Sequence, residues 1–409
     1  MSVSTSAIPT PKVRTGPLPG DGYAYLNWAI PHLRSNPKDD QTRLMAIREY
    51  LSLHLVQPAR ELMDQWAGAS SQAQELRELR CVIQKLQGGP TAWSRFGMQY
   101  EANLAVLERR GLNVIAIREQ WEKACGSYQV FMDRNGLPQV RRRNCDGFWE
   151  WMPQLGNHRA DDNARPLPDD IGSKMPGPYL FDGLGWGGFF ERVYAATVDT
   201  FLGYSCALYA LEPKTEWLAV LLHLHDWTKQ LSDPRVLMSF GEECLDQLRK
   251  AWDADVDLPW PNRAFSIGAG AGESRAVRMV QEAGAVREQA IRDSLGRIEE
   301  QYAARDLHYW AHRFEEATNG AGGPLRILAA VSTHTSFLQH SMRDARRALE
   351  ALGHEVRVLT EDRPFTIIGP LTYHAAIRDF DPDVFFMLDH LRPECGSIIP
   401  RNLPILTWD

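Results

Sequence analysis

Four glycines and one glutamate form the first set of residues whose spacing could bind a ligand. Gly183, Gly185 and Gly188 match the pattern G-x-G-x-x-G, and Gly187 lies within it. Without a Cβ atom the backbone can approach a phosphate closely, and the start of a following helix favours anions. Glu212 lies near the offset at which an acidic residue accepts hydrogen bonds from ribose hydroxyls. The set predicts a nucleotide-like or S-adenosylmethionine-like ligand, and a tight turn without a ligand is the alternative.

A second set of polar residues follows the apolar run RILAAV. The loop 332–336 reads Ser-Thr-His-Thr-Ser and would lie where a parallel sheet presents its ligand-binding loops. His334 is a candidate general base, since imidazole titrates near neutral pH. Asp389 and His390 end a later apolar run and could line the same crevice. A packed or solvated histidine and a strand-end cap are the alternative roles.

Other residues suggest chemistry less strongly. In the stretch 223–226, His-Leu-His-Asp, the two histidines do not share a helix face, so we expect a helix cap or a surface role instead of a metal site. Trp149 and Trp151 could stack on sugars, although packing in a core is the commoner role. The run 141–143 of three arginines is expected to be a solvated strand end or loop.

The elements that would position these residues alternate between short apolar runs and amphipathic helices, which predicts parallel sheets. The expected strands are 179–181, 206–211, 235–240, 326–331, 355–359, 384–388 and 404–408. The expected helices between them are 189–202, 216–224, 243–252, 337–352 and 375–380. Helices are also expected within 23–87, over 101–123, and as one long helix or a pair over 273–314, with a hairpin over 128–143 and a loop over 253–272.

This pattern predicts an α/β protein in which helices precede two Rossmann-like sheets. We expect a disordered start, a helical region, a β-hairpin with a Pro-rich connector, a Rossmann-like domain, a helical connector with a linker, and a partial second Rossmann-like domain. Their expected boundaries are 1–22, 23–126, 127–178, 179–260, 261–323 and 324–409.

Bulk properties exclude several functional classes. The formal net charge of -7 argues against nucleic-acid binding, which needs a clustered basic face. The six cysteines include no CxxC pair, so neither a zinc site nor a redox dithiol is predicted. No signal peptide and no apolar run of about 18 residues is present, so we expect a cytoplasmic protein without a membrane span, which could form a homo-oligomer.

Three stretches of the middle region resemble the α/β domain of motility-accessory-factor-type glycosyltransferases. They are YLFDGLGWGGFFERV, CALYALEPKTEWLAVLL and DPRVLMSFG, within about 175–250. The resemblance implies sugar transfer from a nucleotide-sugar donor. Methyltransferases that use S-adenosylmethionine share this strand-and-turn arrangement and supply the alternative function, and a non-catalytic scaffold is a third.

The last part of the chain resembles the N-terminal half of a GT-B glycosyltransferase, nearest to the spore-maturation CgeB-like proteins. The similar stretches are RILAAVSTHTSFLQHSMRDARRALEALGHEVRVLTE, FDPDVFFMLDHLR and NLPILTWD. In that family this half mainly receives the acceptor, here an unknown glycan or protein, while the other half chiefly binds the donor. The resemblance therefore implies that these 409 residues are incomplete and transfer little sugar alone.

Overall fold

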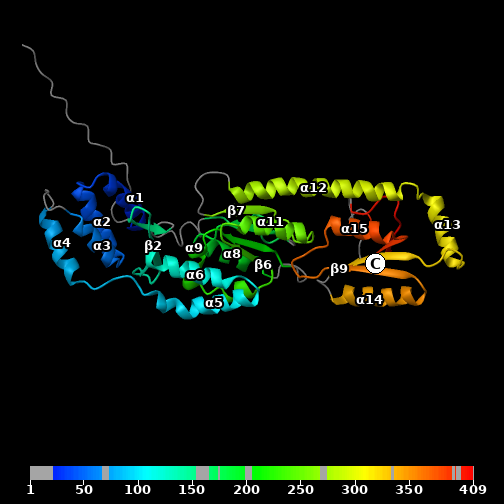
Figure 1. Cartoon of the computed structure of the whole chain (residues 1–409), viewed down its shortest axis with the longest axis horizontal. Helices are drawn as coiled ribbons and strands as arrows, with labels where there is room; N and C mark the ends of the chain where they lie inside the picture. Colours follow the sequence, from blue (N-terminus) through cyan, green and yellow to red (C-terminus); the bar gives the residue numbers. More distant parts are fainter. Residues whose placement is uncertain are drawn as a thin grey trace, which may run out of the picture. The chain divides into compact units, whose positions relative to one another are not determined.

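The computed structural model of the chain is drawn in Figure 1. The chain forms two compact units. The first comprises Met1–Leu104, Val114–Arg165 and Ala219–Asp226, and the second comprises Ala105–Asn113, Pro166–Leu218 and Trp227–Asp409. Within them the structure describes residues 22–66, 73–152, 165–173, 176–198, 205–267, 274–332, 336–388, 392 and 398–408. Each unit is described by itself.

The first unit begins with helices that bury apolar side chains spaced three or four residues apart. Leu44, Ile47, Leu55 and Leu62 are all buried in one core, as their helical spacing predicts. The carboxylate of Asp39 caps the second helix by accepting a hydrogen bond from the Thr42 amide at 3.0 Å. The helices are α1 (Gly22–Ser35), α2 (Asp40–Ser52), α3 (Val56–Asp64) and α4 (Ala73–Lys85).

The expected single helix over 101–123 is wrong, because two helices occupy this region. They are α5 (Gly97–Arg109), which follows the short 3-10 turn η1 (Trp93–Phe96), and α6 (Val114–Ala124), which leads into η2 (Cys125–Ser127). Gly111 has a left-handed φ of 77°, which a helix interior does not allow. Its amide bonds the Glu108 carbonyl at 2.9 Å and closes the first helix.

A small antiparallel sheet completes this unit. The predicted hairpin is confirmed by β1 (Tyr128–Met132) and β2 (Pro138–Arg143), joined by a turn in which Asp133 accepts two backbone hydrogen bonds. A third strand that the sequence reading missed, β3 (Trp149–Met152), pairs with β2. Sequential antiparallel strands of this kind need only short turns.

The second unit contains a four-stranded parallel sheet in the order β6-β5-β4-β7. This confirms the predicted parallel pairing of the strands near 179 and 208. The expected loop over 253–272 is wrong in part, because a strand lies within it and pairs with β4. The strands are β4 (Tyr179–Asp182), β5 (Leu208–Glu212), β6 (Val236–Phe240) and β7 (Arg263–Ser266). The helices between them in the sequence are α8 (Gly188–Ala196), α9 (Thr215–Leu224), α10 (Thr228–Ser232) and α11 (Cys244–Ala254), and α9 belongs to the first unit from Ala219 on.

A buried guanidinium fastens the amino edge of this sheet. Arg235 is only 1% exposed and precedes β6. It donates to the Asp233 carboxylate at 2.9 Å, to the Thr197 hydroxyl at 2.8 Å, and to the carbonyls of Tyr194 and Cys206 at 2.9 and 3.0 Å. The end of α8 and the starts of β5 and β6 are therefore held by one side chain that satisfies carbonyls left unpaired by the helix end.

A second parallel sheet in the same unit has the order β11-β10-β8-β9. Its strands are β8 (Arg326–Val331), β9 (Glu355–Thr360), β10 (Val384–Leu388) and β11 (Ile405–Trp408), and its helices are α14 (Ser336–Ala351) and α15 (Pro370–Phe380). Both parallel sheets have the Rossmann-like character that the alternating pattern predicted. β8 pairs with β9 on one side and with β10 on the other, so the strand order switches between β8 and β10.

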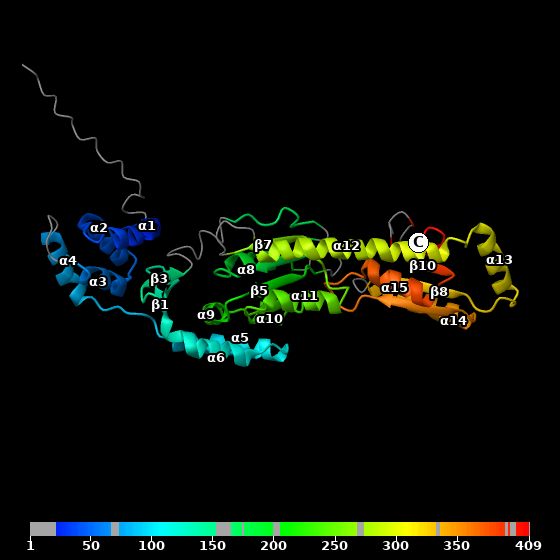
Figure 2. The same cartoon turned by 45° about the horizontal axis from the view of Figure 1, so that its top comes forward.

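A long helix connects the two sheets of the second unit (Figure 2). The predicted helical pair is confirmed as α12 (Arg275–Tyr302) and α13 (Leu307–Thr318). Ala276 near the start of α12 lies in a core shared with β5, whereas Ile298 and Tyr302 near its end lie in a core shared with β8 and β10. Packing at both ends of one helix couples the two sheets.

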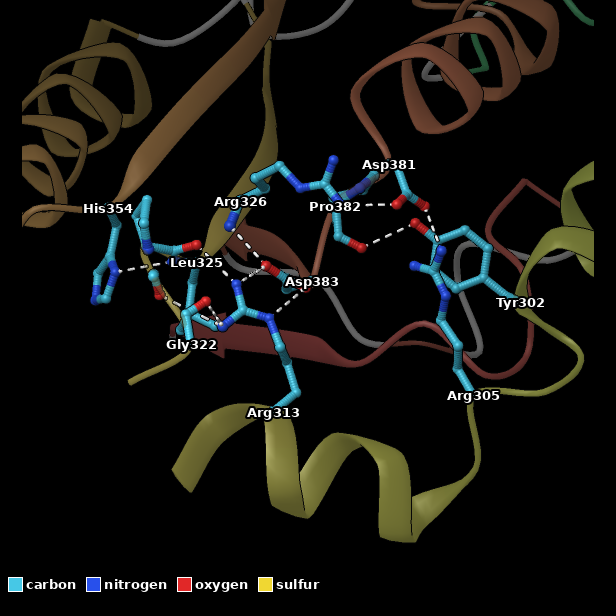
Figure 3. A network of polar contacts seen from close by, with 12 residues as sticks. Tyr302, Arg305, Arg313, Gly322, Leu325, Arg326, His354, Asp381, Pro382 and Asp383 are labelled. Atoms are coloured by element: carbon cyan, nitrogen blue, oxygen red, sulfur yellow. Dashed lines mark hydrogen bonds and ion pairs between the residues drawn. The ribbon is translucent and has the colours of Figure 1, made fainter. Parts of the chain in front are cut away.

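Two aspartates at the start of β10 organise a charged network at the amino edge of the second sheet (Figure 3). The Asp383 carboxylate accepts from two nitrogens of Arg313 at 3.1 and 2.8 Å and from the Arg326 amide at 2.8 Å. The Asp381 carboxylate accepts from Arg305 and from the Arg326 side chain at 2.7 and 2.6 Å. Burial raises the pKa of Asp381, but these hydrogen bonds outweigh it and hold the pKa below its usual range.

Replacing Asp383 should destabilise the second unit strongly. The carboxylate is 3% exposed and its partner Arg313 is 15% exposed, so Asp383→Ala removes the carboxylate partner of a mostly buried cation. Denaturant unfolding should show a loss of about 3–5 kcal/mol. The matched control is Asp379→Ala, whose ion pair with Arg378 is about half exposed and should be worth less than about 1 kcal/mol. Equal effects of the two variants would contradict a structural role for the network.

Candidate functional site

The glycine-rich loop after β4 adopts the left-handed backbone that its composition allows. Gly183, Gly185 and Gly187 have φ of 81°, 57° and 87°, and α8 begins at Gly188. A side chain at Gly183 would collide with the Ile267 carbonyl, and one at Gly187 would collide with the Trp227 ring. Backbone geometry and packing therefore account for two of the glycines without any ligand.

Glu212 lies beside this loop and is bound to it. Its Oε2 accepts a hydrogen bond from the Leu184 amide at 3.0 Å, and its Oε1 accepts from the Lys214 amide at 3.1 Å. The residue is 4% exposed, and this burial raises its pKa to about 7 although the two amides oppose the effect. The carboxylate accepts the hydrogen bond of a loop amide that could otherwise donate to a phosphate. Binding of ribose by Glu212 stays a prediction.

Tryptophans pack around the same loop. The Trp217 indole donates to the Gly185 carbonyl at 2.8 Å, and the buried Trp186 meets the Trp217 ring edge-on at 5.5 Å. The Trp227 indole donates to the Glu191 carboxylate at 2.6 Å, so its ring lies against the start of α8. The loop is thus a well-packed turn, and a ligand would have to approach it beside these rings.

A cavity of about 330 Å³ lies at the carboxyl edge of the second sheet. It lies where the strand order switches, which is the usual position of ligands in open α/β sheets. The ends of β8 and β10 line it, together with side chains before β11 and around the start of α15. Val331, Met387, Leu388, Ile368 and Ile399 form buried apolar walls.

The polar part of this cavity contains Ser332 and Glu361. The Ser332 hydroxyl directly follows β8 and donates to the Glu361 Oε2 at 2.8 Å, and Glu361 directly follows β9. Tyr373 adds a phenol, and Glu361 is the charged residue among the described side chains that line the space. Apolar walls with a few convergent polar groups suit a partly apolar ligand that carries hydroxyl groups.

The structure brings together only part of what the sequence singled out. Ser332 belongs to the predicted loop and lines the cavity, but His334, Asp389 and His390 lie outside the described residues. Glu361 was missed, although an acidic residue at the end of the second strand of a β-α-β unit is the signal that pointed to Glu212. The stretch between the two strands contains no glycine motif, so the sequence alone does not single out Glu361.

His223, from the singled-out stretch 223–226, has a structural role. His223 is not at the surface: it is 3% exposed, bonds the Ala219 carbonyl at 2.7 Å through Nδ1, and stacks on Tyr100 at 3.9 Å. Burial lowers its pKa.

Within the described parts of the chain, no group of three or more His, Cys, Asp or Glu side chains could hold a metal ion. None of the described helices has the length and apolar character to cross a bilayer.

Glu212 should make stability depend on pH in a defined direction. The folded state protonates Glu212 below about pH 7, whereas the unfolded chain does so near 4.5. The folded state therefore holds more protons between these values, and the free energy of unfolding falls as the pH rises through this range. The free energy of unfolding of the wild type, minus that of Glu212→Gln, should fall by roughly 2 kcal/mol between pH 5 and pH 8. Glu242→Gln, an exposed control, should show no such trend, and a flat difference for Glu212→Gln would contradict the burial argument.

Comparison with known proteins identifies no relative for this chain. No family model matches it, and neither the curated proteins nor the solved structures contain a match. The functional conclusions therefore depend on the residues and on the geometry described above.

Proposed function

We propose that this chain acts in glycosyl transfer and that the cavity at the carboxyl edge of the β8–β11 sheet receives the sugar acceptor. The observation that carries the proposal is the pairing of Ser332 with Glu361 at one side of an otherwise apolar space. A carboxylate accepts hydrogen bonds from hydroxyl groups and can take a proton from one as it attacks a sugar carbon. The apolar walls would contact the C–H faces of the ring.

The charge of the cavity favours an acceptor over a donor diphosphate. Glu361 gives its described lining a negative charge, and no described arginine or lysine lines it to balance a diphosphate. A neutral sugar would meet no such repulsion. The nucleotide-sugar donor would then bind elsewhere, as the resemblance of this sheet to an acceptor-binding half implies.

A methyltransferase is the second candidate, and one observation favours it. The first sheet has the order β6-β5-β4-β7, with the glycine loop after β4 and Glu212 at the end of β5. This is the order of the first strands in dinucleotide-binding sheets, whose first loop contacts the cofactor. Binding of S-adenosylmethionine at Gly183–Gly188 would support this function over sugar transfer.

The proposal predicts a neutral sugar in the cavity. Methyl NMR of isoleucine-labelled chain would follow Ile368 and Ile399 during titration with glucose, galactose, mannose and N-acetylglucosamine. At least one sugar should shift these methyl signals, and Glu361→Gln should weaken that binding about tenfold, since a hydrogen bond to a charged group contributes about 1.5–3 kcal/mol. Glu355→Gln is the matched control, because Glu355 is exposed at the amino end of the same strand.

Several outcomes would contradict acceptor binding. Unchanged Ile368 and Ile399 signals with every sugar, in a folded sample, would remove its basis. Equal affinity in wild type and Glu361→Gln would show that the carboxylate takes no part. Calorimetry with UDP, GDP, CMP and S-adenosylmethionine completes the test, because binding of S-adenosylmethionine alone would replace this function with methyl transfer.

A further inference from the structure

The first unit contains an open groove lined by aromatic and charged side chains. The groove has a volume of about 820 Å³ and lies between α1, α3 and the β2–β3 hairpin. We call it the aromatic groove and define it by Arg34, Glu61, Arg141, Phe148, Trp149 and Trp151, which all line it. All six residues belong to the first unit.

The hairpin presents its aromatic residues on a preformed turn. The Asn144 carbonyl side-chain oxygen accepts hydrogen bonds from the Asp146 and Phe148 amides at 3.1 and 2.9 Å, and Gly147 has a left-handed φ of 83°. Arg34 of α1 holds the next segment by donating to the Trp149 carbonyl at 2.9 Å. Phe148 nevertheless remains 58% exposed. An exposed aromatic ring on a turn whose backbone is already fixed is suited to binding, because the backbone has little ordering entropy left to lose.

The floor of the groove is a buried cation surrounded by rings. Arg141 is 3% exposed, so the expectation of a solvated arginine run is wrong for this member. Its guanidinium donates to both Glu61 oxygens at 2.7 Å and lies 4.7 and 5.9 Å from the centres of the Trp149 and Trp151 rings. The fork-shaped pair with Glu61 fixes the floor, and the cation stacks beneath the tryptophans.

The charges of the groove favour a neutral ligand. Among the described residues that line it, Arg34 and Arg141 are balanced by Glu61 and Asp64, and Arg141 is already paired with Glu61. An anion would lack an uncompensated cation, and a cation would meet Arg34 near the Phe148 ring, where its guanidinium already lies at 5.7 Å. The lining of the groove therefore favours neither an anionic nor a cationic ligand.

Hydroxyl groups fit this lining better than peptide groups do. A sugar hydroxyl both donates and accepts, so one group can bond a carboxylate as well as a guanidinium, whereas a peptide needs its N–H for the first and its carbonyl for the second. The apolar C–H face of a pyranose ring can pack on a flat aromatic side chain, while its rim of hydroxyls reaches the charged groups. The volume of the groove leaves room for more than one ring.

We propose that the aromatic groove binds a neutral oligosaccharide, with Phe148 and Trp149 as its stacking platforms. This is a second site in another unit, independent of the cavity proposed for glycosyl transfer. It gives Trp149 the sugar-stacking role that the sequence left as the less common alternative. Trp151 also lines the groove, and its indole donates to the Tyr50 hydroxyl at 3.1 Å.

Calorimetry with the full chain tests the groove. The probes are maltohexaose, cellohexaose, mannohexaose and chitohexaose, and the methyl signal of Ile30, which lines the groove, locates the binding. At least one hexasaccharide should bind, and Trp149→Ala and Phe148→Ala should each weaken it about 5- to 20-fold. Trp149→Phe should retain most of the affinity, because a ring remains. Phe337→Ala removes a ring that is 74% exposed in the other unit and should change nothing.

Three outcomes of these binding experiments would overturn the proposal. Failure of all four hexasaccharides to bind the folded chain would exclude it, as would binding that Trp149→Ala leaves unchanged. A proline-rich peptide that binds in their place and shifts Ile30 would assign the groove to peptides. Glu361→Gln should leave hexasaccharide binding intact, so failure here and failure of the acceptor cavity can be told apart.

Discussion

Arginines at the amino edges of the two parallel sheets, Arg235 buried and Arg313 15% exposed, fix the frame on which the rest of the second unit depends. Arg235 joins α8 to β5 and β6, and Arg313 joins α13 to the start of β10 through Asp383. In both places the guanidinium satisfies several acceptors at once, which a compact ammonium could not do with the same geometry. Because the amino edges are fastened in this way, the loops at the opposite edges need not hold the sheets together. Those carboxyl-edge loops are the ones that can contact a ligand.

The strands that could be predicted best from the sequence are those whose residues are all buried. The strands Leu208–Glu212 and Val384–Leu388 are buried at every position, and unbroken apolar runs reveal such strands directly. The strand Arg263–Ser266 was missed because its side chains are partly exposed and it follows the prolines of the stretch PWP. The strand Trp149–Met152 was missed although the preceding Asp-Gly pair is a hairpin signal. Edge strands with mixed exposure carry too little periodicity to be recognised from four residues.

Individual side chains were harder to place than strands, for a physical reason. Arg141 reads as one of three adjacent solvated arginines, yet its strand neighbour Trp151 and the distant Glu61 create a buried environment for it. His223 likewise reads as part of a polar cluster, but Tyr100 from another helix covers it. Whether a charged or polar residue is buried depends on partners far away in the chain, and the local sequence pattern does not identify those partners.

The glycine motif and the cavity also show why a clear sequence motif need not lie where a ligand can bind. A left-handed φ requires glycine whether or not a ligand is bound, so Gly183 and Gly187 would be selected by the turn and by contact with Ile267 and Trp227 alone. The sequence that follows β8 contains no glycine motif. There the space is bounded by side chains of ordinary type, with Ser332 and Glu361 as its polar pair. The stronger sequence signal thus marks a constraint on the backbone, while the cavity follows from strand polarity and the switch in strand order.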